Sequence, residues 1–172
     1  MGPVSAEVGV DAPRERVFDF LADLANRPSF TDHFIDELHL FRETSAGVGA
    51  GARFRLRAGL ASLWMDTTIE AMETPRVIRE RGSGGRFNRI PVQTVWDLVE
   101  GPGPLTTVRV TFWSRPERAV DRMRELLGGA SLSCRRNWAT ALRRLRDVLE
   151  SEAPVTRVAI AGADRVPNPV SE

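Results

Sequence analysis

The sequence contains no lysine and no tyrosine, one cysteine and two histidines. The missing lysine excludes Schiff-base chemistry, and the missing tyrosine excludes a phenolic acid or base. A single cysteine cannot form a disulfide within the chain. The histidines and the cysteine lack the close ligand spacing of a zinc site. We therefore expect neither a metal nor another cofactor.

Long apolar runs are absent as well. No stretch reaches the roughly 18 consecutive apolar residues that indicate a membrane-spanning helix, and the N-terminus lacks the apolar core of a signal peptide. We therefore expect a cytoplasmic protein without stable membrane insertion.

The charges nearly balance, with 24 basic and 23 acidic residues, so no global field points to nucleic acid. The Arg-rich faces also lack the interleaved aromatic residues on which bases stack, and we expect no nucleic-acid partner.

One helical pattern dominates what is present. The stretch from Ser131 to Glu152 carries its arginines on one half and an apolar stripe on the other, formed by Cys134, Trp138, Ala141, Leu142, Leu145, Val148 and Leu149. Pro154 ends the pattern. A helix with one large apolar face needs a sheet to lie against.

The rest of the chain supplies that sheet. Val4–Val10 alternates as a strand, and two short helices are predicted over Arg14–Ala25 and Ser29–Phe34. Consecutive strands follow over Glu37–Glu43, Arg53–Ala58, Leu63–Met72, Arg76–Gly82, Val92–Glu100 and Thr106–Ser114. Short turns between these strands imply an antiparallel sheet and an α+β fold. A further helix is predicted to begin at Ser114, and Val155–Ala161 is a possible extra strand.

The order of these segments resembles a known superfamily. The opening VSAEVGVDAPRERVFDFLADLANRPSF and the later GVGAGARFRLR, TTIEAMETPRVIRERG, VQTVWDLVEGPGPLTTVRVTF and NWATALRRLRDVLE are similar to the SRPBCC superfamily of polyketide cyclase/dehydrase-like, START-like and birch-pollen-allergen-like proteins. The resemblance implies a helix-grip fold, in which a curved antiparallel sheet of six or seven strands wraps a C-terminal helix around an apolar cavity. We expect one domain over residues 1–153 and a separate tail over residues 154–172.

The inward positions of the predicted sheet and helix provide the candidate ligand-binding residues. They are Phe54, Leu56, Met65, Thr67, Ile69, Ile78, Glu80, Thr94, Trp96, Val110, Phe112, Asn137, Trp138 and Leu142. Glu80 faces inward only if it shares the face of Ile78. A shift of one residue would instead place Arg79 and Arg81 inside, and the pattern leaves both phases open. An inward carboxylate must be paired with a partner, exposed to water in the cavity, or protonated.

Three functions fit these residues. The first is binding or transport of a small hydrophobic or amphipathic molecule, lipid-, polyketide- or aromatic-like, and the scarcity of inward titratable groups favours it. The second is a cyclase or aromatase that moves protons with Glu80 and His33. The third is a partner-binding module that uses Val155–Ala161 as an added strand. A monomer and a homodimer are both compatible with the sequence.

Overall fold

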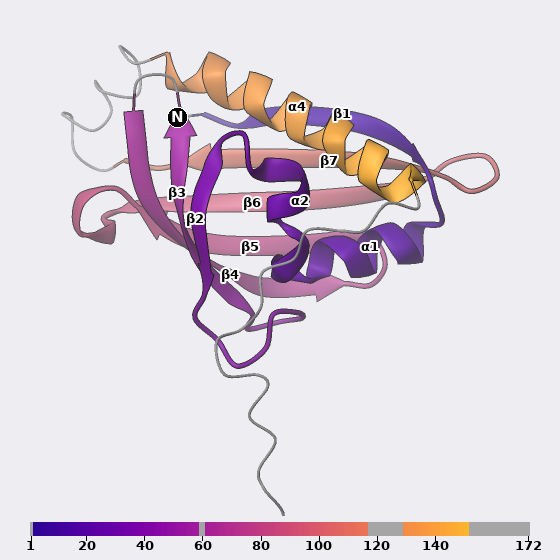
Figure 1. Cartoon of the computed structure of the whole chain (residues 1–172), viewed down its shortest axis with the longest axis horizontal. Coiled ribbons are helices and arrows are strands. Elements are labelled where there is room, and N and C mark those ends of the chain that lie inside the picture. Colours follow the sequence, from indigo (N-terminus) through magenta and orange to yellow (C-terminus); the bar gives the residue numbers. More distant parts are fainter. Residues whose placement is uncertain (1, 59–60, 117–128, 152–172) are drawn as a thin grey trace, which may run out of the picture.

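A curled antiparallel sheet and one long helix make up the computed structural model of the chain, which describes residues 2–58, 61–116 and 129–151 (Figure 1). The strands are β1 (Val4–Asp11), β2 (Ile35–Leu40), β3 (Gly51–Ala58), β4 (Ala61–Glu73), β5 (Val77–Gly84), β6 (Ile90–Glu100) and β7 (Leu105–Ser114). The helical segments are α1 (Arg14–Ala22), η1 (Leu24–Asn26), α2 (Pro28–Thr31), η2 (Arg86–Asn88) and α4 (Ala130–Glu150).

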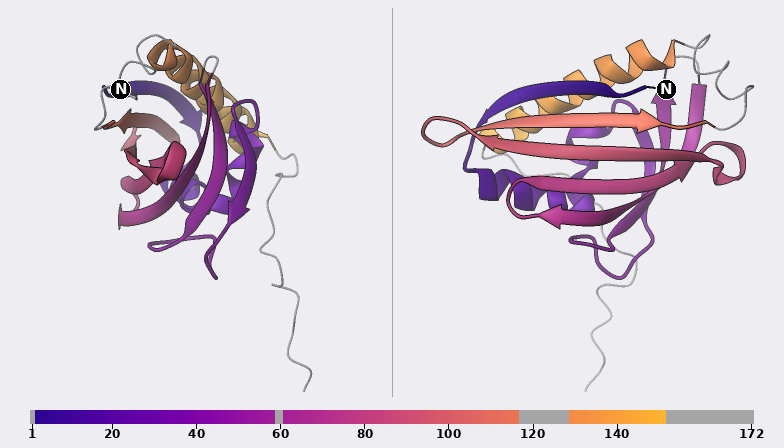
Figure 2. Two further views of the ribbon diagram at one scale, coloured as in Figure 1. Left: turned by 90° about the vertical axis from the view of Figure 1, so that its left-hand side faces the viewer. Right: turned by 180° about the vertical axis from the view of Figure 1, so that it is seen from behind.

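The seven strands form one sheet in the order β1-β7-β6-β5-β4-β3-β2, and every pairing is antiparallel. Consecutive strands from β2 to β7 are neighbours, as their short connections predict. β1 crosses to the far edge and pairs with β7. Figure 2 shows the sheet curling so that its concave side faces α4 and the short helices. The predicted helix-grip α+β fold is therefore confirmed.

Helix α4 matches the predicted helix to within two residues at each end. Gly129 precedes it in a left-handed conformation with φ of 60°, which glycine adopts without steric cost. The predicted stripe is the buried face, formed by Cys134, Trp138, Ala141, Leu142, Leu145 and Leu149. Val148 is only half-buried. The arginines of α4 lie on the other side, where Arg144 forms an ion pair with Asp32.

The outer face of the sheet carries cross-strand ion pairs. Arg81 contacts Glu70 at 3.0 Å, and Arg109 contacts Glu7 at 2.9 Å. Opposite charges that face each other across neighbouring strands stabilise the pairing modestly. The strand arginines therefore point to solvent, and the apolar residues of the same strands point into the concave side.

The strand predicted over Glu37–Glu43 was wrong in position, because β2 runs from Ile35 to Leu40. The pairing with β3 shifts register between Asp36 and His39, and Glu37 has a positive φ of 51°. Such a bulge changes the inward phase within the strand, so strict alternation misplaces its start. β5 likewise continues past Gly82 to Gly84.

The short helices are also shorter than predicted. α1 ends at Ala22, and α2 occupies only Pro28–Thr31, with Pro28 at its first position. Most of the helix predicted from Ser114, and the whole strand predicted over Val155–Ala161, lie outside the described residues.

Candidate functional site

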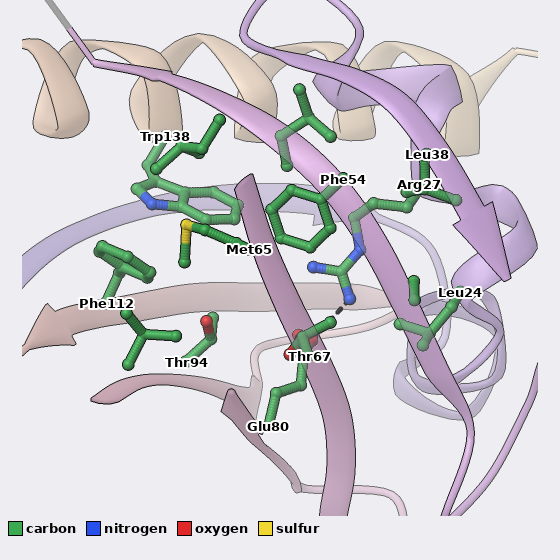
Figure 3. Close-up of a pocket in the computed structure, with 14 residues that line it drawn as sticks. Leu24, Arg27, Leu38, Phe54, Met65, Thr67, Glu80, Thr94, Phe112 and Trp138 are labelled. Carbon is green, nitrogen blue, oxygen red and sulfur yellow. Dashed lines mark hydrogen bonds and ion pairs between the residues drawn. The ribbon is translucent and has the colours of Figure 1, made fainter. Parts of the chain in front are cut away.

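A small pocket lies between the inner face of the sheet, the η1–α2 segment and α4 (Figure 3). Its volume is about 20 Å³. The lining is largely apolar and consists of Leu24, Arg27, Ile35, Leu38, Ala52, Phe54, Leu56, Met65, Thr67, Glu80, Val92, Thr94, Phe112 and Trp138. The polar groups gather on one side of this space, around Glu80.

Glu80 faces inward and is only 3% exposed, which decides the phase that the sequence left open. The register explains its surroundings: Glu80 pairs with Thr94 on β6 and with Ile69 on β4. Its Oε1 accepts hydrogen bonds from Arg27 Nη2 at 2.5 Å and from Trp96 Nε1 at 2.7 Å. Its Oε2 accepts one from the Thr67 hydroxyl at 3.2 Å. The buried carboxylate is thus both ion-paired and hydrogen-bonded.

Arg27 is the partner that sequence analysis missed. It lies between η1 and α2, and it is 5% exposed. The Cζ atom of its guanidinium lies 4.9 Å from the centre of the Trp96 ring and 5.9 Å from that of Phe30. These cation–π contacts hold the group beside Glu80. The available signal was indirect: pairing with a basic residue is one of the ways to bury an acid, but Arg27 lies in the gap between the two predicted short helices, where no periodic pattern shows which way a side chain points.

Aromatic rings form the other side of the site. Trp138 on α4 lies 5.5 Å from Trp96, 5.2 Å from Phe34 and 6.2 Å from Phe112, measured between ring centres. The first two contacts are edge-to-face, an arrangement that aromatic pairs prefer. Trp138 therefore joins α4 to the sheet and to the start of β2.

The predicted ligand-binding residues other than Asn137 divide into two groups. Those that line the pocket are Phe54, Leu56, Met65, Thr67, Glu80, Thr94, Phe112 and Trp138. Ile69, Ile78, Trp96, Val110 and Leu142 lie behind this lining, each at most 1% exposed, and belong to the core. Leu24, Arg27, Ile35, Leu38, Ala52 and Val92 line the pocket without having been predicted to do so.

His33 and Asn137 form a separate connection at the edge of the site. The His33 Nε2 donates to the Asn137 carbonyl oxygen at 3.1 Å, and the Asn137 side-chain amide donates to the Arg57 carbonyl oxygen at 3.0 Å. Neither His33 nor Asn137 is part of the pocket lining. The two predicted acid–base candidates, Glu80 and His33, therefore belong to different hydrogen-bond groups. His39 is exposed on β2.

The position of His33 predicts a pH-dependent stability. Burial lowers its pKa below the usual 6.5, and the positive charge of Arg144 contributes, while the Asn137 carbonyl opposes the shift. Its Nδ1 is buried without a partner among the described residues, so protonation there gains no hydrogen bond. The folded state then binds this proton more weakly than the unfolded state. The stability that the neutral His33 ring contributes is fully present above the usual pKa of 6.5. It is lost as the pH falls from 6.5 through the lowered pKa of the folded state.

Two measurements check this prediction. An NMR titration of the His33 ring should give a midpoint below 6.5. Urea unfolding should show a loss of stability on acidification that is smaller in the His33→Gln variant. A His33 midpoint at or above the usual value would contradict the prediction that burial dominates the pKa of this ring.

Within the described ranges, no group of three or more His, Cys, Asp or Glu side chains is placed to hold a metal ion. None of the helices that the structure describes is long and apolar enough to cross a membrane.

Solved structures with the same fold are numerous. The KanY protein, solved by NMR, has a TM-score of 0.70 and 18% identity, over 88% of this chain and 100% of that one. The Zhui aromatase/cyclase from Streptomyces sp. R1128 has a TM-score of 0.66 and 19% identity, over 86% and 93%. A START superfamily protein from Mycobacterium smegmatis has a TM-score of 0.57 and 14% identity, over 83% and 98%. At these identities the similarity establishes the fold alone.

The sequence comparison is more specific. No curated protein matches the chain significantly. Residues 1–150 match the family described as polyketide cyclase / dehydrase and lipid transport, and this span contains every strand and helix named above. The chain belongs to the polyketide cyclase / dehydrase and lipid transport family.

Proposed function

We propose that the chain binds a small apolar or amphipathic molecule between the sheet and α4. The observation that carries the proposal is the composition of the pocket, where apolar and aromatic side chains surround one buried polar cluster. Ligand sites in proteins combine a mostly apolar lining with a few fixed polar groups in this way. The family includes lipid transport proteins, which supports the same function.

The volume of the pocket sets a condition on binding. About 20 Å³ holds roughly one water molecule, whereas pockets for small-molecule ligands measure about 300–1,000 Å³. A ligand can therefore enter only when lining side chains or the segments above them move. Met65 and Leu38 are the natural candidates, because Met65 is unbranched and flexible and Leu38 lies on the edge strand β2.

Binding of a neutral apolar probe tests the proposal. N-phenyl-1-naphthylamine should bind with a blue-shifted fluorescence, and Ala52→Leu should weaken that binding at least about fivefold. The added side chain fills the space beside the fully buried Ala52. Extra side-chain atoms in a packed core cost about 1–3 kcal/mol, and we expect a similar loss of binding free energy when the probe must share this space. The matched variant Val99→Leu enlarges a side chain that is 60% exposed and should leave binding unchanged. Absence of probe binding, or equal weakening by both variants, would count against the pocket.

Geometry favours binding over proton transfer. The Glu80 carboxylate already accepts hydrogen bonds from Arg27, Trp96 and Thr67, and His33 directs its Nε2 to a backbone carbonyl. A general acid or base needs a free path to the proton that it transfers. The Glu80 carboxylate and the Nε2–H of His33 instead hold segments of the fold together, and His33 does not line the pocket.

A further inference from the structure

One donor at the pocket has no acceptor within the described ranges. Trp138 is 3% exposed and lines the pocket, and its Nε1 is buried without a hydrogen-bond partner among the described residues. Trp96, the other buried tryptophan of this site, donates its Nε1 to Glu80. Leaving a buried donor unpaired costs about 1–3 kcal/mol, so the Trp138 indole is the group whose pairing with a ligand would yield the largest gain.

Two further polar groups face the same space. Arg27 donates one hydrogen bond from its side chain within the described part of the chain, to Glu80 through Nη2. Figure 3 shows another of its terminal nitrogens pointing toward the middle of the lining side chains. The Thr94 side chain also lines the pocket and is 7% exposed. The figure places Trp138 and Arg27 on different sides of this space, with Met65 and Phe54 near its centre.

We propose that the bound molecule is an apolar compound with a neutral acceptor oxygen, a ketone or a phenol, and that Trp138 Nε1 donates to that oxygen. The proposal rests on the proposed function, because it names the chemistry of the ligand that the same pocket binds. Arg27 and Thr94 supply donors for a second oxygen of the same molecule. A pure hydrocarbon would leave the indole unpaired.

The charge of the site selects a neutral ligand over an anion. Arg27 is already neutralised by Glu80 at 2.5 Å. A ligand carboxylate would bring a second negative charge next to Glu80 around one guanidinium, in a site with little water. Like charges in a buried site disfavour the ionised forms. Fatty acids and other carboxylates are therefore poor ligands by this account.

Three ligands of nearly equal shape test the proposal: 2-acetonaphthone, 2-ethylnaphthalene and 2-naphthoate. Each is titrated into the full chain, uniformly ¹⁵N-labelled so that each of the four tryptophans gives one indole N–H signal. The ketone should bind about three- to tenfold more tightly than the hydrocarbon, as one added hydrogen bond predicts, and at least tenfold more tightly than the carboxylate. The ketone should also move the Trp138 indole proton downfield, whereas the hydrocarbon should not.

The Trp138→Phe variant assigns that signal and removes the donor while keeping an aromatic ring. It should abolish the preference for the ketone, so that 2-acetonaphthone and 2-ethylnaphthalene bind to the variant with affinities within about twofold of each other. Trp64→Phe makes the same change at an outer-face position that is 37% exposed and should preserve the preference. Equal affinities for ketone and hydrocarbon, or a tighter carboxylate, would overturn the proposal while leaving the proposed function intact. If none of the three compounds binds, both fail.

Discussion

Replacing Glu80 by leucine is expected to lower the free energy of unfolding by about 3–5 kcal/mol, because it leaves a buried charge without its partner. Arg27 and Glu80 are 5% and 3% exposed, so water cannot replace the lost ion pair at either side chain. Trp96 and Thr67 also lose their acceptor. Urea unfolding followed by tryptophan fluorescence gives the difference directly.

The double variant Arg27→Met/Glu80→Leu separates the loss of a partner from the value of the pair itself. Apolar replacements of similar size for both members of a buried pair are often neutral or stabilising, so the double variant should recover most of the loss. As a control, Glu70→Leu removes the partner of Arg81 on the outer face and should cost about 1 kcal/mol or less. The single variant Arg27→Met completes the comparison. If the double variant loses as much free energy of unfolding as Arg27→Met and Glu80→Leu lose together, Arg27 and Glu80 do not act as a pair.

Replacing Trp96 by alanine should have an effect of similar size, about 3–5 kcal/mol. The side chain is fully buried, and it contacts Phe30 and Trp138 with ring centres 6.2 and 5.5 Å apart. It also donates a hydrogen bond to Glu80 and stacks under the Arg27 guanidinium. The variant therefore creates a cavity and weakens the ion pair at the same time.

Trp64→Ala is the matched control, because Trp64 lies on the outer face of β4 with 37% exposure and a loss there should stay near 1 kcal/mol. Trp96→Phe keeps most of the ring and removes only the donor to Glu80, so its loss should fall between the two. A small effect of Trp96→Ala would show that Trp96 does not hold the polar cluster against α4.

Most of the fold could be predicted because its pattern is regular. Alternation along Arg53–Ala58 and the apolar stripe of α4 each require one face toward the core, and the short connections leave only an antiparallel arrangement. The start of β2 could not be predicted in the same way. A bulge at Glu37 changes the inward phase within six residues, and nothing in the local composition marks it.

The site was predictable only where regular strands and α4 form it. Phe54, Met65, Thr67 and Trp138 follow from strand or helix phase and line the pocket. Arg27 comes from an irregular segment, and its approach to Glu80 brings together residues 53 positions apart. Local patterns contain no information about such a distant contact. Asn137 lies outside the pocket lining, and its side-chain amide donates to the Arg57 carbonyl oxygen.

Native mass spectrometry of the freshly purified chain, followed by organic extraction, tests the central claim most directly. The account predicts a bound apolar molecule of defined mass in the space beneath α4, retained by the wild-type chain and by Val99→Leu but displaced in Ala52→Leu. A chain that carries no small molecule, and that takes up none from a panel of apolar ketones and phenols, would contradict it.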